Sequence, residues 1–135
     1  PGRPECRPEG IRRSPRRSAT VARMIKQLER TDVIVVVQTE DLPRHRGVMS
    51  LLSATSKWRF IRIRLDRDAP LPELVGLLGH ELQHALEVAA DPGVRDEPAL
   101  RRLYERIGHG AAGGPYETLA AREVEKAVLR EVGAR

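Results

Sequence analysis

Three short apolar segments in the first half of the chain predict β-strands. Residues 33–37 form an unbroken β-branched run that is too short for a buried helix and typical of an inner strand. A second strand is expected over 48–52. In 59–65 apolar residues alternate with Arg62 and Arg64, so the apolar side chains should face the core and the arginines a solvated outer face. These segments predict a short, mainly antiparallel three-stranded sheet.

Apolar residues at helical spacing predict helices beside this sheet. The first runs from Ser14, a capping residue followed by proline, to about Arg30. The helix over 71–90 is apolar along most of its length, which indicates a central, buried element. Two more helices are expected over 96–108 and 116–132. The expected fold class is α+β, with the sheet packed on the central helix and two to three further helices.

Size and charge indicate one domain with a basic N-terminal tail. The chain has 135 residues, 40% of them hydrophobic, enough for a single modest core that we expect over 14–135. Residues 1–13 are rich in proline, glycine and arginine and should be flexible. The net charge of +5 is concentrated in the first 30 residues, which hold 9 Lys and Arg against 3 Glu. With no aromatic residues to stack on bases, this region is interpreted as a solvated arm rather than a specific nucleic-acid or membrane tether.

Cysteine content and hydropathy exclude several classes of protein. Cys6 is the only cysteine, so neither an internal disulfide nor a cysteine-based metal cluster can form. No apolar run approaches the roughly 18 residues of a membrane span, so a soluble protein is expected. The chain starts at Pro1 without an initiator Met, which is compatible with an upstream signal peptide and leaves the compartment open.

The central predicted helix contains the motif His80-Glu81-Leu82-Gln83-His84. Residues four apart lie one turn along the same helix face, so both imidazoles can bind one metal ion, for which Zn²⁺ is well suited. Glu81 lies beside them and is the expected general base, which takes a proton from water and delivers it to the leaving amine. Random placement would give this pattern in roughly one per cent of chains of this composition, so the motif is a specific signal.

A catalytic zinc usually has three protein ligands and one open position. The candidates for the third ligand are Glu87, His109, Glu117 and Glu123. Glu87 lies nearly two turns beyond His80, too far along a straight helix for a compact site. His109 lies in a glycine-flanked link, and the other two glutamates lie on the final predicted helix, which can fold back against the central one.

A helix with two histidines, followed by a glutamate on a later helix, resembles the gluzincin group of zinc metallopeptidases, in particular its minimal single-domain bacterial forms. Glu117 followed by Ala120 is similar to the third-ligand helix of that group, where a small residue one turn on lets the helices approach. The similarity in layout extends over 31–132. The metzincin pattern differs, because it has Gly and His where this chain has Glu87 and Ala90.

The resemblance implies a zincin-like fold and a zinc ion held by His80, His84 and Glu117, with Glu81 as the catalytic base. Glu87 then either hydrogen-bonds a ligand histidine or has a plain packing role. The expected function is hydrolysis of peptide bonds in a peptide or protein substrate. The alternative is a zinc-stabilised binding module with little or no peptidase activity.

The resemblance also implies a place for the substrate. An extended peptide should pair with an edge strand near the metal, and either 48–54 or 59–65 is suitable. A donor should stabilise the oxyanion, for which Tyr104, His109 and Tyr116 are candidates.

Overall fold

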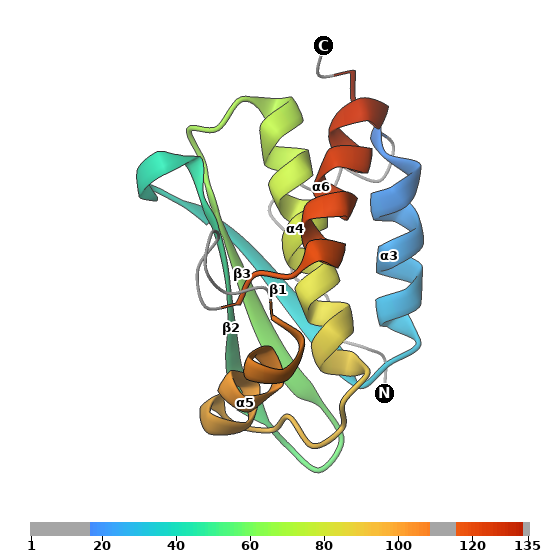
Figure 1. Ribbon diagram of the computed structural model, residues 1–135, viewed down its shortest axis with the longest axis vertical. Coiled ribbons are helices and arrows are strands. Elements are labelled where there is room, and N and C mark those ends of the chain that lie inside the picture. Colours follow the sequence, from blue (N-terminus) through green and yellow to red (C-terminus); the bar gives the residue numbers. More distant parts are fainter. Residues whose placement is uncertain (1–16, 109–115, 134–135) are drawn as a thin grey trace.

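Two stretches of the chain, residues 17–108 and 116–133, are described by the computed structural model (Figure 1). Their fold is α+β, as predicted, with four α-helices and one three-stranded sheet. In chain order the elements are α3 (Ala19–Glu29), β1 (Val33–Glu40), the short 3₁₀ helix η1 (Pro43–His45), β2 (Gly47–Ala54), β3 (Arg59–Asp66), α4 (Leu71–Ala89), α5 (Glu97–Ile107) and α6 (Leu119–Glu131). None of the helices in these two stretches is long and apolar enough to cross a membrane. The tail predicted over 1–13 lies outside the described residues.

The sheet is mixed, which corrects the prediction of a mainly antiparallel one. Its strand order is β1-β3-β2. β3 pairs antiparallel with β2 but parallel with β1, where Val35 lies opposite Ile61. Short connections join β1 to β2 and β2 to β3, so the chain reverses direction twice. β3 therefore runs antiparallel to β2 and parallel to β1.

β2 is an edge strand. Within the described residues, only one of its edges pairs with another strand. Its register with β3 shifts between Leu51 and Ser53, an irregularity that interrupts the ladder near its C-terminal end. The first half of β2 therefore presents a regular row of unpaired backbone groups.

α4 lies between the sheet and the helices α3 and α6 (Figure 1). It contacts all three strands as well as both of these helices. The apolar face of β3, formed by Ile61, Ile63 and Leu65, is fully buried in this core, as the alternation predicted. Arg62 and Arg64 lie half-buried on the opposite face of the sheet. The prediction of a central, buried helix is confirmed.

The predicted helix boundaries are accurate for α4 and α5 and less so for α6. Asp96 caps α5, as expected. α6 begins at residue 119 rather than 116, because the Oγ1 of Thr118 accepts the N–H of Ala121 at 3.1 Å and so caps the helix there. α3 is capped by Ser18, and the predicted start at Ser14 lies outside the described residues.

Two glycines on α4 let α6 pack against its backbone. A Cβ atom at Gly79 would lie 2.8 Å from Cγ2 of Val128, which is closer than carbon atoms pack. A Cβ atom at Gly76 would lie 3.0 Å from Cδ2 of Leu129, but this side chain is only half-buried and can turn aside. The separation of the two helices is therefore set mainly by the missing side chain at Gly79.

The buried Arg59, 1% exposed, ties the C-terminal end of α4 to the sheet. Its guanidinium forms a bidentate ion pair with Asp32, at 2.7 and 2.8 Å. One of its nitrogens, Nη1, also donates to three backbone carbonyls, those of Val88, Asp91 and Val94, at 3.0, 2.8 and 3.0 Å. These carbonyls belong to the last turn of α4 and the loop after it, and those of Val88 and Asp91 also accept a backbone N–H each.

Gly79→Ala should destabilise the fold, whereas Gly76→Ala should not. A methyl group at 79 meets the fully buried Val128, and such overpacking costs about 1–3 kcal/mol, against a gain of about 1 kcal/mol in helix propensity. At 76 the half-buried Leu129 can move, so the propensity gain offsets the contact. Urea unfolding of the two variants measures the difference. Equal free energies of unfolding would contradict the idea that Gly79 sets the helix separation.

Arg59→Met should lower the free energy of unfolding by about 3 kcal/mol, because three backbone carbonyls lose a charged donor and Asp32 loses its ion-pair partner. Arg62→Met is the control. Arg62 lies on the same strand but on the outer face of the sheet, and its substitution should lower the free energy of unfolding by less than about 1 kcal/mol. If the two variants unfold at the same denaturant concentration, Arg59 does not have this role.

The Asp32 carboxylate should make stability sensitive to acid. The hydrogen bond and charge of Arg59 hold the pKa of Asp32 below its usual range. This stabilisation is therefore complete above the unfolded pKa of about 3.9 and is lost as the pH falls through the lower folded pKa. Asp32→Asn should flatten the pH dependence of the unfolding free energy in this acidic window, and an unchanged slope would exclude the contribution.

Candidate metal centre

The motif at 80–84 lies in the middle of α4, which presents both imidazoles on one side. The ring centroids of His80 and His84 are 5.0 Å apart, with the ring planes at 76°. One ligand atom from each of His80, Glu81 and His84 lies within 4.8 Å of the others. The structure therefore brings together the three residues that the helical repeat predicted to be neighbours.

A carboxylate contacts the Nδ1 atom of each imidazole. Oε1 of Glu125, from α6, is 2.7 Å from Nδ1 of His80, and Oε1 of Glu87, from α4 itself, is 2.9 Å from Nδ1 of His84. When Nδ1 carries the proton and donates to the carboxylate, Nε2 keeps the lone pair that a metal ion binds. Both rings thus offer Nε2 as the ligand atom.

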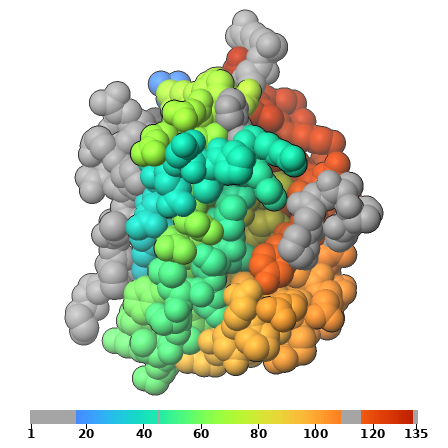
Figure 2. Space-filling model, turned by 90° about the vertical axis from the view of Figure 1, so that its left-hand side faces the viewer, coloured from blue at the N-terminus to red at the C-terminus, as the bar shows by residue number. Residues whose placement is uncertain are grey.

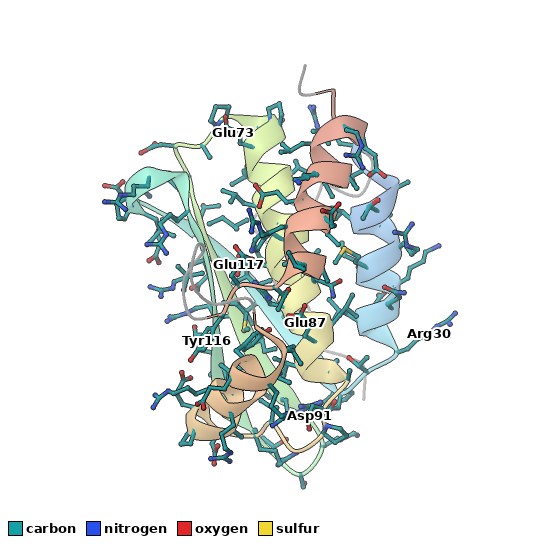
Figure 3. All side chains as sticks on the ribbon, in the orientation of Figure 1. Arg30, Glu73, Glu87, Asp91, Tyr116 and Glu117 are labelled. Carbon is teal, nitrogen blue, oxygen red and sulfur yellow. The ribbon has the colours of Figure 1, made fainter. Side chains whose placement is uncertain are left out.

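Glu117 lies in the segment that leads into α6 (Figure 3). Its Oε1 is 3.1 Å from Nε2 of His80. Two ligand atoms that bind one zinc ion at about 2.0–2.1 Å in tetrahedral geometry lie about 3.3 Å apart, so this pair is spaced to share an ion. The expectation that Glu117 lies on the final helix is wrong, because Thr118 caps α6 and Glu117 precedes the cap.

Glu81 lies under β2 and beside the imidazoles. It is 6% exposed, and its Oε2 is 3.9 Å from Nε2 of His80. Burial raises the pKa of this carboxyl above its usual value, although the two imidazoles act in the opposite direction. A Cβ atom at Gly47 would lie 3.1 Å from Cγ of Glu81, so the missing side chain at the start of β2 lets the strand pass directly over this carboxyl.

Glu87 connects three helices through one carboxylate. In addition to His84, it accepts hydrogen bonds from the hydroxyl of Tyr104 at 2.9 Å and from that of Thr118 at 2.8 Å. Burial raises the pKa of Glu87, but the hydrogen bonds from these three groups outweigh it and lower the pKa overall. Of the two roles left open for Glu87, contact with a candidate ligand histidine is therefore the one observed.

Glu123, another candidate for the third ligand, is not brought to this site. Glu123 is 71% exposed, and its nearest charge partner is Lys126 at 3.8 Å. His109 lies outside the described residues. Of Glu117 and Glu123, Glu117 is thus the one that reaches His80.

Both described tyrosines that were candidate oxyanion donors have other partners. The hydroxyl of Tyr104 donates to Glu87, and burial is the main reason that its pKa is raised. The hydroxyl of Tyr116 donates to Glu97 at 2.7 Å. Neither hydroxyl is free in this arrangement to stabilise a developing charge.

Sequence reasoning missed Glu125, although its position on α6 is informative. Ala121 and Val128 are completely buried. Glu125 lies four residues after the first and three before the second, which puts it on the same buried stripe of the helix. A single carboxylate in an apolar stripe is the signal that would have assigned it to a partner in the interior.

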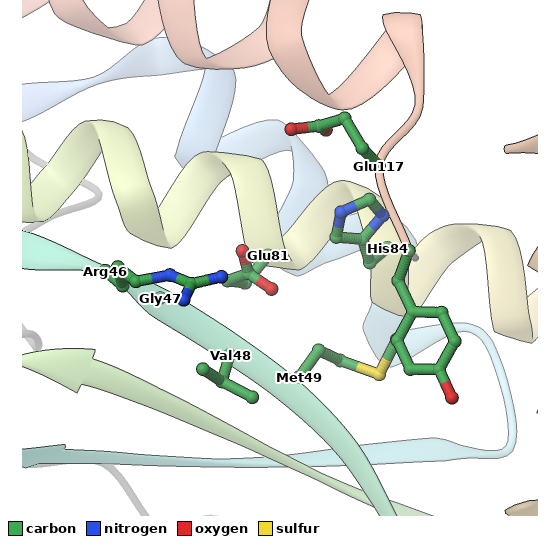
Figure 4. A pocket seen from close by; sticks show the side chains of 8 residues that line it. Arg46, Gly47, Val48, Met49, Glu81, His84 and Glu117 are labelled. Carbon is green, nitrogen blue, oxygen red and sulfur yellow. The ribbon is translucent and has the colours of Figure 1, made fainter. Parts of the chain in front are cut away.

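A cleft of about 230 Å³ opens over this group of residues. It is lined by Arg46, Gly47, Val48, Met49, Glu81, His84, Tyr116 and Glu117 (Figure 4). In Figure 2 the molecule is turned so that this face is in view, with β2 on one side and α5 on the other. The candidate base and two of the candidate ligands are therefore accessible from the surface.

Comparison with protein families, with curated proteins and with solved structures finds no match to this chain. The resemblance to gluzincins therefore depends on the motif at 80–84 and on Glu117. The geometry of these residues carries the functional interpretation.

Glu125→Gln should lower the pKa of His80 in the metal-free protein. Burial lowers this pKa, but the hydrogen bond to Glu125 and the nearby charges of Glu81 and Glu117 outweigh it, so the pKa is raised overall. Removing the Glu125 charge removes a large part of that increase. NMR titration of the imidazole C–H resonances measures it. Glu123→Gln, an exposed change on the same helix, is the matched control, and an equal effect of both variants would contradict a direct contact.

Proposed function

We propose that the protein is a zinc-dependent metallopeptidase of the gluzincin type, with a zincin-like fold. His80, His84 and Glu117 are the proposed zinc ligands and Glu81 the proposed general base. The observation that carries the proposal is the 3.1 Å approach of Glu117 to His80, between two separate segments of the chain. Two imidazoles, one carboxylate and a side open to a cleft correspond to a catalytic zinc site rather than a closed structural one.

Glu81 performs the proton transfers of the proposed reaction. Zinc, when bound, supplies a Lewis acid that polarises the peptide carbonyl and makes water more acidic. Glu81 takes one proton from a water molecule while the water oxygen bonds to the carbonyl carbon. It returns this proton to the amide nitrogen as the C–N bond breaks, leaving a carboxylic acid and an amine. The burial that raises the pKa of Glu81 suits a group that holds a proton between these two transfers.

The contacts around the histidines support this assignment. Glu125 and Glu87 fix the orientation of His80 and His84 through Nδ1 and so keep Nε2 of each ring directed to one place. Thr118 links Glu87 to the segment that carries Glu117. The proposed ligands are thus held by a shared set of hydrogen bonds instead of by separate flexible side chains.

The free edge of β2 is the proposed binding site for an extended substrate. Of the two strands considered, β3 is paired on both sides, so β2 is the one with unpaired backbone groups among the described residues. Such an edge can add a peptide as a further strand. Gly47 brings this edge over Glu81, which places a paired peptide next to the proposed base.

A zinc-stabilised binding module without peptidase activity is the second candidate. The cleft of about 230 Å³ is smaller than the roughly 300–1,000 Å³ of most ligand pockets, which favours shallow binding. A zinc ion held by α4 and by the segment before α6 would also stabilise the fold whether or not a bond is cleaved.

Metal analysis and hydrolysis of a peptide library distinguish these functions. The protein should hold one zinc ion per chain after dialysis, and His80→Ala should lose it. Glu81→Gln should keep the zinc and lower kcat by about 100-fold or more, because the proton acceptor is gone. Glu123→Gln should leave both properties unchanged.

Each result has a definite meaning. Absence of zinc from the parent protein would exclude both candidates. Zinc that stabilises the fold without any turnover would support the binding module. Full activity of Glu81→Gln would exclude Glu81 as the base.

A further inference from the structure

The proposed substrate cleft has a cationic end and an apolar end. Figure 4 shows Arg46 on one side of Glu81, with Met49 and His84 on the other side. Met49 is buried, and the ring of Tyr116, which also lines the cleft, packs on a neighbouring tyrosine at 5.0 Å between centroids. A ligand that spans the cleft therefore meets different chemistry on the two sides of Glu81.

Arg46 has a fixed backbone and an available charge. Its carbonyl accepts the N–H of Asp66 at 2.9 Å, and the next residue, Gly47, begins β2. The side chain is exposed, and no carboxylate of the described residues forms an ion pair with it. Arg59 and Arg64, in contrast, pair with Asp32 and Glu40. Arg46 thus presents an unneutralised guanidinium at an anchored position.

Arg46 is the one Lys or Arg among the described residues that line the cleft. The other charged residues that line the cleft, Glu81 and Glu117, are acidic. A bound divalent cation compensates these two charges, and the guanidinium then gives this end of the cleft a positive potential. A substrate carboxylate would be attracted there, because a guanidinium binds a carboxylate through two parallel hydrogen bonds.

We propose that Arg46 is a specificity-determining residue that selects peptides carrying a carboxylate close to the cleaved bond. Gly47 lies against Glu81, and an extended chain advances about 3.3 Å per residue, so Arg46 reaches a group within one or two residues of that bond. The carboxylate is that of an Asp or Glu side chain or of the peptide C-terminus. This inference rests on the proposed peptidase function and adds a substrate class to it.

The test uses zinc-loaded protein and pairs of peptides. The two members of a pair differ only in having Glu or Gln at one position near the cleaved bond. Each peptide is made with a free and with an amidated C-terminus. The parent should cleave the acidic peptide with a KM about 10-fold lower than the neutral one, as expected for one charge-assisted contact at an exposed site. Arg46→Gln should abolish this difference with little change in kcat. Arg46→Glu should prefer a Lys peptide. Arg44→Gln, which removes an exposed charge from η1 away from the cleft lining, is the matched control and should keep the parent preference.

The two sources of the carboxylate separate in the same experiment. A preference that survives amidation assigns the contact to a side chain, and one that amidation removes assigns it to the C-terminus. If Arg46→Gln cleaves both peptides in the parent ratio, the inference is overturned while the peptidase proposal stands. If the parent cleaves nothing, the peptidase proposal fails, and the affinity of fluorescent peptides for the zinc-loaded protein then tests the role of Arg46. Selective binding of the acidic peptide that Arg46→Gln abolishes supports this role. Unselective or absent binding excludes it.

Discussion

The close packing of α6 against α4 is the constraint on which the candidate metal centre depends. Gly79 leaves room for Val128 against the backbone of α4. This contact fixes the height and rotation of α6, and with them the carboxylate of Glu125 at 2.7 Å from His80. The segment that enters α6 carries Glu117, so the same contact also determines where the proposed third ligand lies. Displacement of α6 by a single methyl group would alter distances on which metal binding depends at the level of tenths of an ångström.

α4 is able to serve as this platform because it is held along its whole length. Arg59 anchors its last turn to the sheet, and the apolar face of β3 packs along its side. In the same last turn, Glu87 joins it to α5 and to the cap of α6. A helix restrained in this way keeps the two histidines on one side through contacts within the protein itself.

Local sequence patterns were sufficient for the parts of the fold that depend on a repeat. Alternation in 59–65 predicted which face of β3 is buried, and the helical period predicted that His80 and His84 share a face. The strand order could not be predicted in this way. Which strands pair depends on how whole strand faces are buried against the rest of the fold, and the pattern within one segment does not show this. The mixed sheet follows from that global choice.

Spacing alone predicted the candidate site only where its residues lie on one element, and Glu117 was named through the resemblance to gluzincins. Glu117 and Glu125 both reach His80 across the contact between helices, so their positions depend on the separation of α4 and α6, which no spacing in the chain encodes. The role of Arg59 was likewise not predicted. Its odd-numbered position places it on the same face of β3 as the buried residues, but the role of a charge on an apolar face becomes clear only once its partners are known. The edge of β2 that pairs with no other described strand has a consequence of a different kind. Unpaired backbone groups that suit a peptide also suit the same edge of a second molecule, so this edge is a template for self-association. The break in register between Leu51 and Ser53 shortens the regular part of that template, and an occupied edge would be shielded from such contacts altogether.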